Sequence, residues 1–468
     1  MNKYKTLLSN TLLISLGTFT SKLLVFFMVR FYTGYLTPSD YSTADLIAQT
    51  ANLLFPIISM GITDGVFRFA MDSTVNRSSV FTTGALTIFS GSLLFLIIAP
   101  LLSLSYDFKS YVWLIVVYTL AAAFHALCSQ YIRAIGKTLL FAVQGIINTC
   151  LVIILNIIFL AGFDLGITGY VLSVVLADAL CTLFLIFKER LWNAITLKPD
   201  FSVLKPMLLY SIPLIPSTIF WWITSVSDRY MVSWMIGSQA NGIYTVSYKI
   251  PTLLILLSGV FMKAWQFSAV TEAEGDSQEH VKFYSRVWGS FQAFMFLAGS
   301  VVIAFSKLAI KLLAADEYYS AWKYVPVLSM AMVFTAFVSF TGTVYVVNKK
   351  SGLSFATSFL GAASNILLNV ILIPSPLGVQ GAAIATVASY MLVFVVRSVN
   401  VKKYIPFKLY SGQVVLNTLV IILQTVFMLF EIKGWILVQV LCIGALAAIN
   451  YKFLIGFLNK ILNSIKKK

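Results

Sequence analysis

Long apolar runs dominate the pattern of hydrophobic and polar positions along this chain. The runs are continuous rather than alternating, and most reach the ~20 residues that a helix needs to cross the hydrocarbon core of a bilayer. The pattern therefore predicts an all-α membrane protein with about fourteen transmembrane helices. The expected spans cover residues 7–33, 41–70, 79–104, 110–134, 139–161, 167–187, 207–236, 240–270, 284–305, 322–347, 353–373, 379–399, 410–430 and 434–457.

Composition and charge distribution agree with this class. The chain has 468 residues, of which 59% are hydrophobic and 11% charged, whereas soluble domains carry roughly 25% charged residues. The net charge of +16 is compatible with nucleic-acid binding, but the basic residues concentrate in alternate loops, so we expect no nucleic-acid partner. By the positive-inside rule the asymmetry predicts cytoplasmic N and C termini. The opposite loops hold only Lys109, Lys307, Lys311 and Lys433.

Several chemistries are not expected. The four cysteines lie within apolar spans and form no CxxC pair, so we expect neither disulfides nor a metal site. No glycine-rich phosphate-binding loop occurs, so no nucleotide cofactor is expected. The loops are too short for a soluble catalytic domain, and we expect no catalytic residues and no enzyme. The cysteines are Cys128, Cys150, Cys181 and Cys442.

The chain contains an internal sequence repeat. Residues 133–156, "RAIGKTLLFAVQGIINTCLVIILN", match "VVNKKSGLSFATSFLGAASNILLN", which begins 213 positions later at residue 346. Both stretches carry a lysine, Lys137 or Lys350, and an asparagine, Asn156 or Asn369, at equal spacing. An even number of helices per copy makes two copies parallel, which is typical of transporters. We expect an N-terminal lobe over 1–205 (helices 1–6), a C-terminal lobe over 206–408 (helices 7–12), and two added helices with a basic cytoplasmic tail over 409–468.

Polar residues follow stripes on four expected spans that hold equivalent places in the two copies. A charge at the centre of a span costs about 2.5–3.5 kcal/mol, so a stripe that contains charge favours a face toward water, a partner or a ligand. We expect the four spans to line a hydrated cavity between the lobes. The stripes are Thr11, Ser15, Thr18 and Lys22; Asp45, Gln49, Asn52, Ser59 and Thr63; Ser217, Thr224 and Asp228; and Thr245, Lys249, Thr252, Gly259, Lys263 and Gln266.

The charges within the spans are mostly positive. Arginine and lysine in a water-filled cleft bind phosphate or diphosphate strongly, so an anionic guest is expected. Membrane-embedded acids are candidates for coupling to protons or sodium ions. The candidate substrate-binding residues are Lys22, Arg30, Arg68, Arg229, Lys249 and Lys263, and the candidate ion-coupling residues are Asp64, Asp228 and Asp45.

Two acid–base pairs leave alternatives open. Asp64 and Arg68 are four residues apart on one helix, where they either neutralise each other or meet a substrate. Asp228 and Arg229 are adjacent in "WWITSVSDRYMV", so their side chains point about 100° apart and do not form a good pair with each other. Arg229 must find another partner.

Other intramembrane polar groups have no obvious partner. His125 and Asp178 stand alone in the pattern, and we expect each to bond to neighbouring helices rather than to act in catalysis. Four prolines interrupt the lumen-lining spans, either as hinges or as packing breaks. They are Pro56, Pro213, Pro216 and Pro251.

Three stretches carry a family resemblance. "NILLNVILIPSPLGVQGAAIATVASY" (365–390), "VSDRYMVSWMIGSQANGIYTVSYKI" (226–250) and "DEYYSAWKYVPVLSMA" (316–331) resemble polysaccharide flippases of the multidrug/oligosaccharidyl-lipid/polysaccharide exporter superfamily. The resemblance implies a fold of MATE-like lobes in a bacterial plasma (inner) membrane. It also implies alternating access and a polyprenyl (undecaprenyl) pyrophosphate-linked oligosaccharide as substrate. Membrane lipids and glycan polymerases or glycosyltransferases are the expected partners.

Two other functions stay open. A cation-coupled drug antiporter of the same superfamily shares the architecture, but it is expected to have membrane-embedded acids with fewer basic residues. A membrane-bound polysaccharide polymerase or ligase is expected to have large outer loops or an intramembrane histidine, and the chain has two histidines, His125 and His280. The residues do not specify which glycan is carried, and capsule, O-antigen, teichoic-acid and peptidoglycan precursors are all compatible with them.

Overall fold

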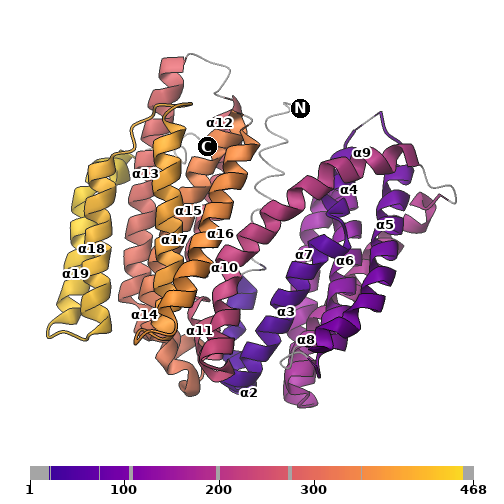
Figure 1. Ribbon diagram of the computed structural model, residues 1–468, viewed down its shortest axis with the longest axis horizontal. Helices are drawn as coiled ribbons and strands as arrows, with labels where there is room; N and C mark the ends of the chain where they lie inside the picture. The colour runs from indigo at the N-terminus through magenta and orange to yellow at the C-terminus, as the bar shows by residue number, and fades with distance from the viewer. Residues whose placement is uncertain are drawn as a thin grey trace. The chain divides into compact units, whose positions relative to one another are not determined.

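The computed structural model describes residues 21, 23–72, 74–104, 109–196, 201–271, 277–348 and 350–456, and these residues form helices and no strand (Figure 1). Among these described residues, ten helices are long and apolar enough to cross a membrane, or twelve if each of two bent pairs is one span. Two more expected spans coincide with the shorter apolar helices Leu23–Tyr35 and Trp435–Ile449. The all-α membrane fold is confirmed, and the count of fourteen stays a prediction.

Backbone contacts divide the chain into two compact units, Met1–Trp222 and Ile223–Lys468. The expected lobe limits after residues 205 and 408 stay predictions. Helix α10 (Ile215–Met235) runs through the division. Unit 1 contains α2 (Val29–Tyr35), α3 (Pro38–Ile58), α4 (Ile62–Ala70), α5 (Arg77–Ile98), η1 (Ala99–Leu104), α6 (Val112–Ala134), α7 (Thr138–Asn156), η3 (Ile157–Gly162), α8 (Gly166–Glu189), η4 (Leu191–Ala194), α9 (Phe201–Ser211) and η5 (Ile212–Leu214).

Unit 2 is built around one aromatic core. Trp288 is fully buried, and its indole lies 5.0 Å from the Phe337 ring and 5.2 Å from the Phe340 ring, measured between centroids. Large rings bury much apolar area and pack well edge to face, so they fix the helices that carry them. The helices of this unit are α11 (Ser238–Ser247), α12 (Thr252–Thr271), α13 (Ser277–Ala304), α14 (Ser306–Leu313), η7 (Asp316–Lys323), α15 (Val325–Val347), α16 (Ser351–Leu372), α17 (Val379–Val401), α18 (Ser411–Leu429) and α19 (Trp435–Ile449).

One span is broken in each unit, after a 21-residue helix in unit 1 and after a 10-residue helix in unit 2. Helices α3 and α4 meet at an angle of 58°, and α11 meets the Thr252–Met262 part of α12 at 43°. Pro56 lies within α3, just before the first break, and Pro251 lies in the turn at the second. Proline removes a backbone donor and clashes with the preceding turn, so both breaks follow from the sequence. Each unit therefore contains one bent span, with the bend at a different distance from the start of the span.

The structure extends the internal repeat to three consecutive helices. Helices α6 and α15 are both 23 residues long, and α7 and α16 start at matched positions. The matched lysines also lie at similar places, since Lys137 forms an ion pair with Glu189, the last residue of α8, and Lys350 lies 5.7 Å from the Tyr404 ring centre just beyond α17. Each hinge lysine therefore holds the end of the third helix in its own unit.

A π-helix explains a change of register between the copies. The spacing is 213 from Lys137 to Lys350 but 212 from Gly166 to Gly378, and both glycines have positive φ angles, 51° and 54°. Between the matched lysines and glycines, unit 1 contains the π-helical segment Ile157–Gly162, and the wider turn of such a segment holds one extra residue. Gly169 and Gly381 then match in both sequence and structure.

Gly381 gives a stability prediction. A Cβ at this position would lie 2.4 Å from the carbonyl oxygen of Leu372, so α16 and α17 approach more closely than alanine allows. We expect Gly381→Ala to lower the free energy of unfolding by about 1–3 kcal/mol, because a backbone oxygen cannot move without shifting α16. Thermal unfolding of the purified protein in detergent measures this. Gly352→Ala is the control, since nothing lies within 4 Å of its added Cβ; equal melting temperatures for Gly381→Ala and wild type would contradict the prediction.

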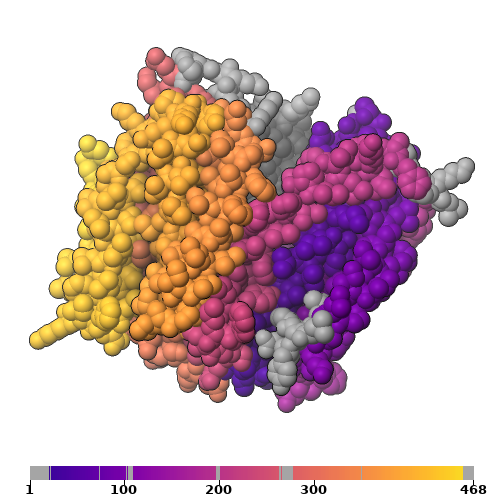
Figure 2. Space-filling view, in the orientation of Figure 1, coloured from indigo at the N-terminus to yellow at the C-terminus, as the bar shows by residue number. Residues whose placement is uncertain are grey.

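Helices α18 and α19 attach to α13 through buried amide side chains. Gln292 on α13 accepts a hydrogen bond from Asn417 on α18 at 3.2 Å, and Asn417 also donates to Asn450 at 3.2 Å. Further along α13, the Ser300 hydroxyl donates a hydrogen bond to the side-chain oxygen of Gln424 at 2.7 Å. In lipid, such bonds hold helices together where the hydrophobic effect contributes little. The outer faces of α18 and α19, at the yellow end of unit 2 in Figure 2, carry exposed apolar side chains such as Val415 and Leu441, as a lipid-facing helix does.

A lysine between two indole rings connects α14 to η7 and to the start of α19. The Lys307 ammonium lies 4.3 Å from the Trp322 ring centre and 4.4 Å from that of Trp435, and it forms an ion pair with Glu431. The Lys307 hydrogen bond and charge hold the pKa of Glu431 below its usual range. The contribution of the ion pair is therefore present at neutral pH and is lost as the pH falls through the depressed pKa of the carboxyl.

We expect Lys307→Ala to lower the free energy of unfolding by about 1–2 kcal/mol through the loss of the two cation–π contacts. The measurement is thermal unfolding in detergent at pH ~7, with Lys307→Arg as the matched control that keeps the charge between the rings. A stability loss as large in Lys307→Arg as in Lys307→Ala would show that the charge is not what holds α14 to the start of α19.

Candidate functional site

The predicted substrate residues of unit 1 lie on exposed surface where the structure describes them. Arg30 on α2 and Arg68 on α4 are exposed. Asp64 lies one helical turn before Arg68 and is also exposed, and no ion pair joins the two within the described ranges. Of the two alternatives for Asp64 and Arg68, mutual neutralisation is therefore not what this structure shows. Lys22 lies outside the described residues.

Asp45 is buried, whereas we expected it to lie on a polar stripe that lines a cavity. The side chain is 8% exposed on α3, and its carboxylate accepts a hydrogen bond from the amide of Gln49 at 3.4 Å. The backbone carbonyl oxygen of Gln49 accepts a hydrogen bond from the indole N–H of Trp222 at 3.1 Å. The acid is thus turned into unit 1, because helix packing rather than the polar pattern alone decides which face is buried.

Asp228 is fully buried inside unit 2, which explains why an acid stands in an apolar span. Its Oδ2 accepts hydrogen bonds from the hydroxyl of Tyr244 on α11 at 2.8 Å and from that of Tyr248. Its Oδ1 accepts from the backbone N–H of Arg229 at 2.9 Å, and the hydroxyl of Thr386 on α17 lies 3.3 Å from Oδ2. A buried carboxylate is tolerated when donors surround it. Asp228 therefore joins α10, α11 and α17.

Arg229 and Lys249 lie beside this carboxylate site. The guanidinium of Arg229 is 4.6 Å from the ring centre of Tyr248, so the base stacks on one of the tyrosines that bond the acid. Lys249 is half-buried in the turn that separates α11 from α12. Lys263 lies on α12, and its side chain is outside the described residues. Unit 2 thus brings Asp228 and Arg229 together through Tyr248, which the sequence pattern did not predict.

Asparagines extend the Asp228 site into an oxygen-rich cluster. Asn365 and Asn369, one turn apart on α16, are both fully buried, and Asn369 donates to the Asn365 side-chain oxygen at 3.0 Å. The Asn365 amide reaches the Thr386 hydroxyl at 3.4 Å, next to Asp228. The side-chain oxygen of Asn369 is buried and has no hydrogen-bond partner among the described residues.

The cluster has the donors that a hard cation prefers. Carboxylate, amide and hydroxyl oxygens suit Na⁺-like and Ca²⁺-like ions, and the cluster contains no nitrogen or sulfur ligand that would select a transition metal. The buried Asn369 oxygen without a partner fits such a role, because an isolated buried acceptor is otherwise costly. The signal available in the sequence was the spacing of Asn365 and Asn369, which puts both on one helix face.

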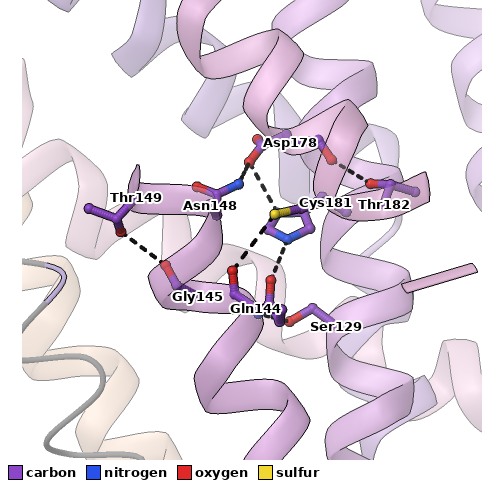
Figure 3. Close-up of polar contacts among 9 residues, drawn as sticks. Ser129, Gln144, Gly145, Asn148, Thr149, Asp178, Cys181 and Thr182 are labelled. Atoms are coloured by element: carbon purple, nitrogen blue, oxygen red, sulfur yellow. Dashed lines mark hydrogen bonds and ion pairs between the residues drawn. The ribbon is translucent and has the colours of Figure 1, made fainter. Parts of the chain in front are cut away.

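Unit 1 contains a second buried polar network, between α6, α7 and α8 (Figure 3). Asp178 and His125, each expected to bond to neighbouring helices, bond to each other: His125 Nδ1 lies 3.1 Å from Asp178 Oδ1. His125 Nε2 lies 2.9 Å from the Gln144 side-chain oxygen, and Asn148 donates to Asp178 at 2.7 Å. The Gln144 amide donates to Ser129 at 3.1 Å. The expected bonds of His125 and Asp178 to neighbouring helices are therefore present, but sequence spacing did not reveal that the two residues are each other's partners.

Comparisons with known proteins place the chain in a family. The family model described as "Polysaccharide biosynthesis protein" matches residues 28–323. A search of curated proteins finds no match. Among solved structures, the lipid II flippase MurJ in an inward closed conformation is similar over 96% of this chain and 100% of that chain, with a TM-score of 0.66 and 15% sequence identity.

Multidrug transporters share the same fold. An inward-facing MATE family transporter of the MOP superfamily matches with a TM-score of 0.61 and 14% identity, covering 82% of this chain and 95% of that chain. An outward-facing structure of such a transporter gives a TM-score of 0.61 and 16% identity, covering 85% and 95%. At these identities the likeness establishes the fold, and the family model establishes the membership. The chain belongs to the family described as polysaccharide biosynthesis protein.

Proposed function

We propose that the protein is a flippase that moves a polyprenyl (undecaprenyl) pyrophosphate-linked oligosaccharide from the cytoplasmic to the outer leaflet for cell-surface polysaccharide synthesis. Family membership supports the substrate class. The observation that carries the proposal is the different placement of acids and bases: Asp45 and Asp228 are buried, whereas Arg30 and Arg68 are exposed. Asp64 is exposed as well, so the exposed charges that the structure describes among these five candidates are two bases and one acid, an excess of positive charge.

This charge suits a diphosphate headgroup. A guanidinium presents several N–H donors in a plane and binds phosphate oxygens in a bidentate manner, more strongly than a neutral donor does. In the proposed mechanism Arg30, Arg68, Arg229 and the lysines Lys22, Lys249 and Lys263 hold the diphosphate and its first sugars. The polyprenyl chain stays in the lipid, so only the polar headgroup crosses through the protein.

The broken spans provide for alternating access. One bend falls in each unit, between α3 and α4 in unit 1 and between α11 and α12 in unit 2. A helix that is already interrupted changes its angle with little loss of backbone hydrogen bonds. We infer that the two units rock about these bends, exposing the headgroup site first to the cytoplasm and then to the outside.

The Asp228 cluster is the proposed coupling site in this mechanism. A monovalent cation bound among Asp228, Asn365, Asn369 and Thr386 would stabilise one arrangement of α10, α16 and α17. An ion shifts a conformational equilibrium only by its differential affinity for the two states. Asp64 and Asp45 remain lesser candidates, since the first is exposed and the second bonds to Gln49 within its own helix.

The remaining expectations complete the proposal. The protein lies in the bacterial plasma membrane with both termini cytoplasmic, works with glycan polymerases or glycosyltransferases, and acts as a transporter rather than an enzyme. The shared fold with MATE transporters favours one alternative, a cation-coupled drug antiporter. That function predicts efflux of cationic dyes, whereas a diphosphate site disfavours them.

Reconstituted proteoliposomes test the function. Polyprenyl diphosphate oligosaccharides with a fluorescent sugar are incorporated, and a membrane-impermeant quencher reports the fraction in the outer leaflet. We expect protein-dependent exchange between the leaflets and no transport of a cationic dye. Dye transport without lipid exchange would contradict the proposal and support the antiporter.

A further inference from the structure

The His125–Asp178 network is a candidate site that the proposed transport mechanism does not use. Its side chains come from three helices, and the charged pair is well shielded, with 17% of the His125 side chain and 14% of that of Asp178 exposed. Two acceptors face the imidazole from opposite sides: a carboxylate oxygen at Nδ1 and the Gln144 amide oxygen at Nε2 (Figure 3). Only the doubly protonated ring donates to both.

The orientation of Gln144 supports this assignment of protons. Its amide nitrogen donates to the Ser129 hydroxyl at 3.1 Å, which leaves its oxygen toward His125. A neutral ring that keeps its proton on Nδ1 would instead set Nε2 against the Gln144 oxygen, two acceptors 2.9 Å apart. The amide would then have to turn over, with Ser129 donating to it. Protonation of the ring is thus linked to the direction of the hydrogen bonds between α6 and α7.

The matched place in unit 2 holds a permanent cation. Arg397 on α17 is 5% exposed, and its guanidinium donates to the Thr357 hydroxyl at 2.9 Å and to the Val338 carbonyl oxygen at 2.8 Å. By the offset of 213, Thr357 corresponds to Gln144 and Val338 to His125.

Gly342, the counterpart of Ser129, makes room for that cation. A Cβ on Gly342 would lie 2.7 Å from Nη1 of Arg397. The positions of His125, Ser129 and Gln144 in unit 1 therefore correspond to three positions that surround a guanidinium in unit 2. The helical triad α15–α16–α17 encloses a positive charge where α6–α7–α8 holds the imidazole and its partners. In unit 2 the charge is fixed, because arginine does not deprotonate in proteins.

We propose that His125, Asp178 and Gln144 form a proton-binding site inside unit 1, in which His125 takes up one proton from water and is held as the imidazolium. The site adds one positive charge to unit 1 and completes the hydrogen bonds that tie α6 to α7 and α8. These bonds are present while the ring carries the proton, and the bond to Gln144 is lost or reversed as the pH rises and the proton leaves. The assignment does not depend on which cargo the protein carries.

The acid next to the ring favours its charged form. Asp178 faces Nδ1 at 3.1 Å, and a negative charge stabilises an imidazolium. Tyr118 on α6 interacts electrostatically with Asp178 and with Asp45 on α3. Cys181 on α8 points its thiol at the Gln144 carbonyl oxygen at 3.7 Å. The other packed helices contribute groups that are exposed: Asp64 and Arg68 on α4, Arg77 on α5 and Cys150 on α7.

Nitrogen-15 NMR of the full chain in lipid nanodiscs tests the proposal directly. Selective labelling of histidine gives signals from His125 and His280 alone, provided that the purification tag contains no histidine. The shifts of the two ring nitrogens distinguish imidazolium from each neutral tautomer. At pH ~7.5 a free imidazole is mostly neutral, since it titrates near ~6.5. We expect His125 to show two protonated nitrogens at this pH, and His280→Gln assigns the signals.

Two variants separate a proton site from a merely structural pair. Asp178→Asn keeps the shape but removes the charge, and we expect His125 to become neutral at pH ~7.5. Gln144→Glu adds a carboxylate at Nε2, and we expect the imidazolium to persist to higher pH than in wild type. Gel filtration of each variant checks its folding. A wild-type His125 with one unprotonated nitrogen at pH ~7.5 would overturn the proposal, and this result needs no variant.

Discussion

Asp228→Asn is expected to insert and fold like wild type but to lose lipid transport, by at least about tenfold in the rate of leaflet exchange, which corresponds to ~1.4 kcal/mol. The amide keeps an acceptor oxygen for Tyr244 and Tyr248, so the junction of α10 and α11 survives. What it loses is the negative charge that a coupling cation requires. The fluorescence-quenching exchange assay measures the rate, and thermal unfolding checks the fold.

A second substitution at the same place separates charge from structure. Asp228→Leu leaves the hydroxyls of Tyr244, Tyr248 and Thr386 without an acceptor, and we expect it to destabilise the protein by about 3–5 kcal/mol. Asp164→Asn is the control, because Asp164 is an exposed acid in the turn before α8. Wild-type exchange by Asp228→Asn would limit Asp228 to a structural role and remove it from ion coupling.

Arg68→Gln is expected to reduce exchange of the lipid-linked oligosaccharide by about ten- to a hundredfold. Hydrogen bonds from a charged group contribute about 1.5–3 kcal/mol each, and Arg68 is an exposed guanidinium on the broken second span. Arg68→Lys keeps the charge but loses the bidentate geometry, so an intermediate rate is expected. The rates come from the same exchange assay, at equal amounts of reconstituted protein.

Arg286→Gln provides the matched control for this prediction. Arg286 is exposed on α13, where its Nε–H donates to the Lys282 carbonyl oxygen at 3.4 Å. Removal of its charge changes the net charge by the same amount as Arg68→Gln does. If both variants slow exchange equally, the effect is one of net charge, and Arg68 has no specific role in headgroup binding.

The periodic features of the sequence predicted the fold well. Continuous apolar runs fix where helices form, because a bilayer requires that each backbone group be bonded within its own segment. The matches at Lys137 and Asn156 predicted the repeat. In unit 2, Lys350 contacts Tyr404 beyond the third helix of the triad, whereas Lys137 in unit 1 pairs with Glu189 at the end of that helix.

The direction of the polar stripes was harder to predict. Asp45 and Asp228 lie on stripes of the expected period, yet both face the interior of their own unit. The partners of Asp228 are tyrosines, which read as apolar in a hydropathy pattern although each carries a hydroxyl. His125 and Asp178 meet because α6 packs against α8, and periodicity within one helix carries no information on that packing.

The most direct test of the central claim is a comparison of three ligands that share one polyprenyl chain. Binding to the detergent-solubilised protein is measured by native mass spectrometry for the diphosphate oligosaccharide, the monophosphate and the free alcohol. A positively charged headgroup site predicts that the diphosphate lipid binds most tightly and that the alcohol binds weakly. It also predicts that added salt weakens the binding of the diphosphate lipid. Equal binding of all three lipids, or tighter binding of a cationic amphiphile, would contradict the account.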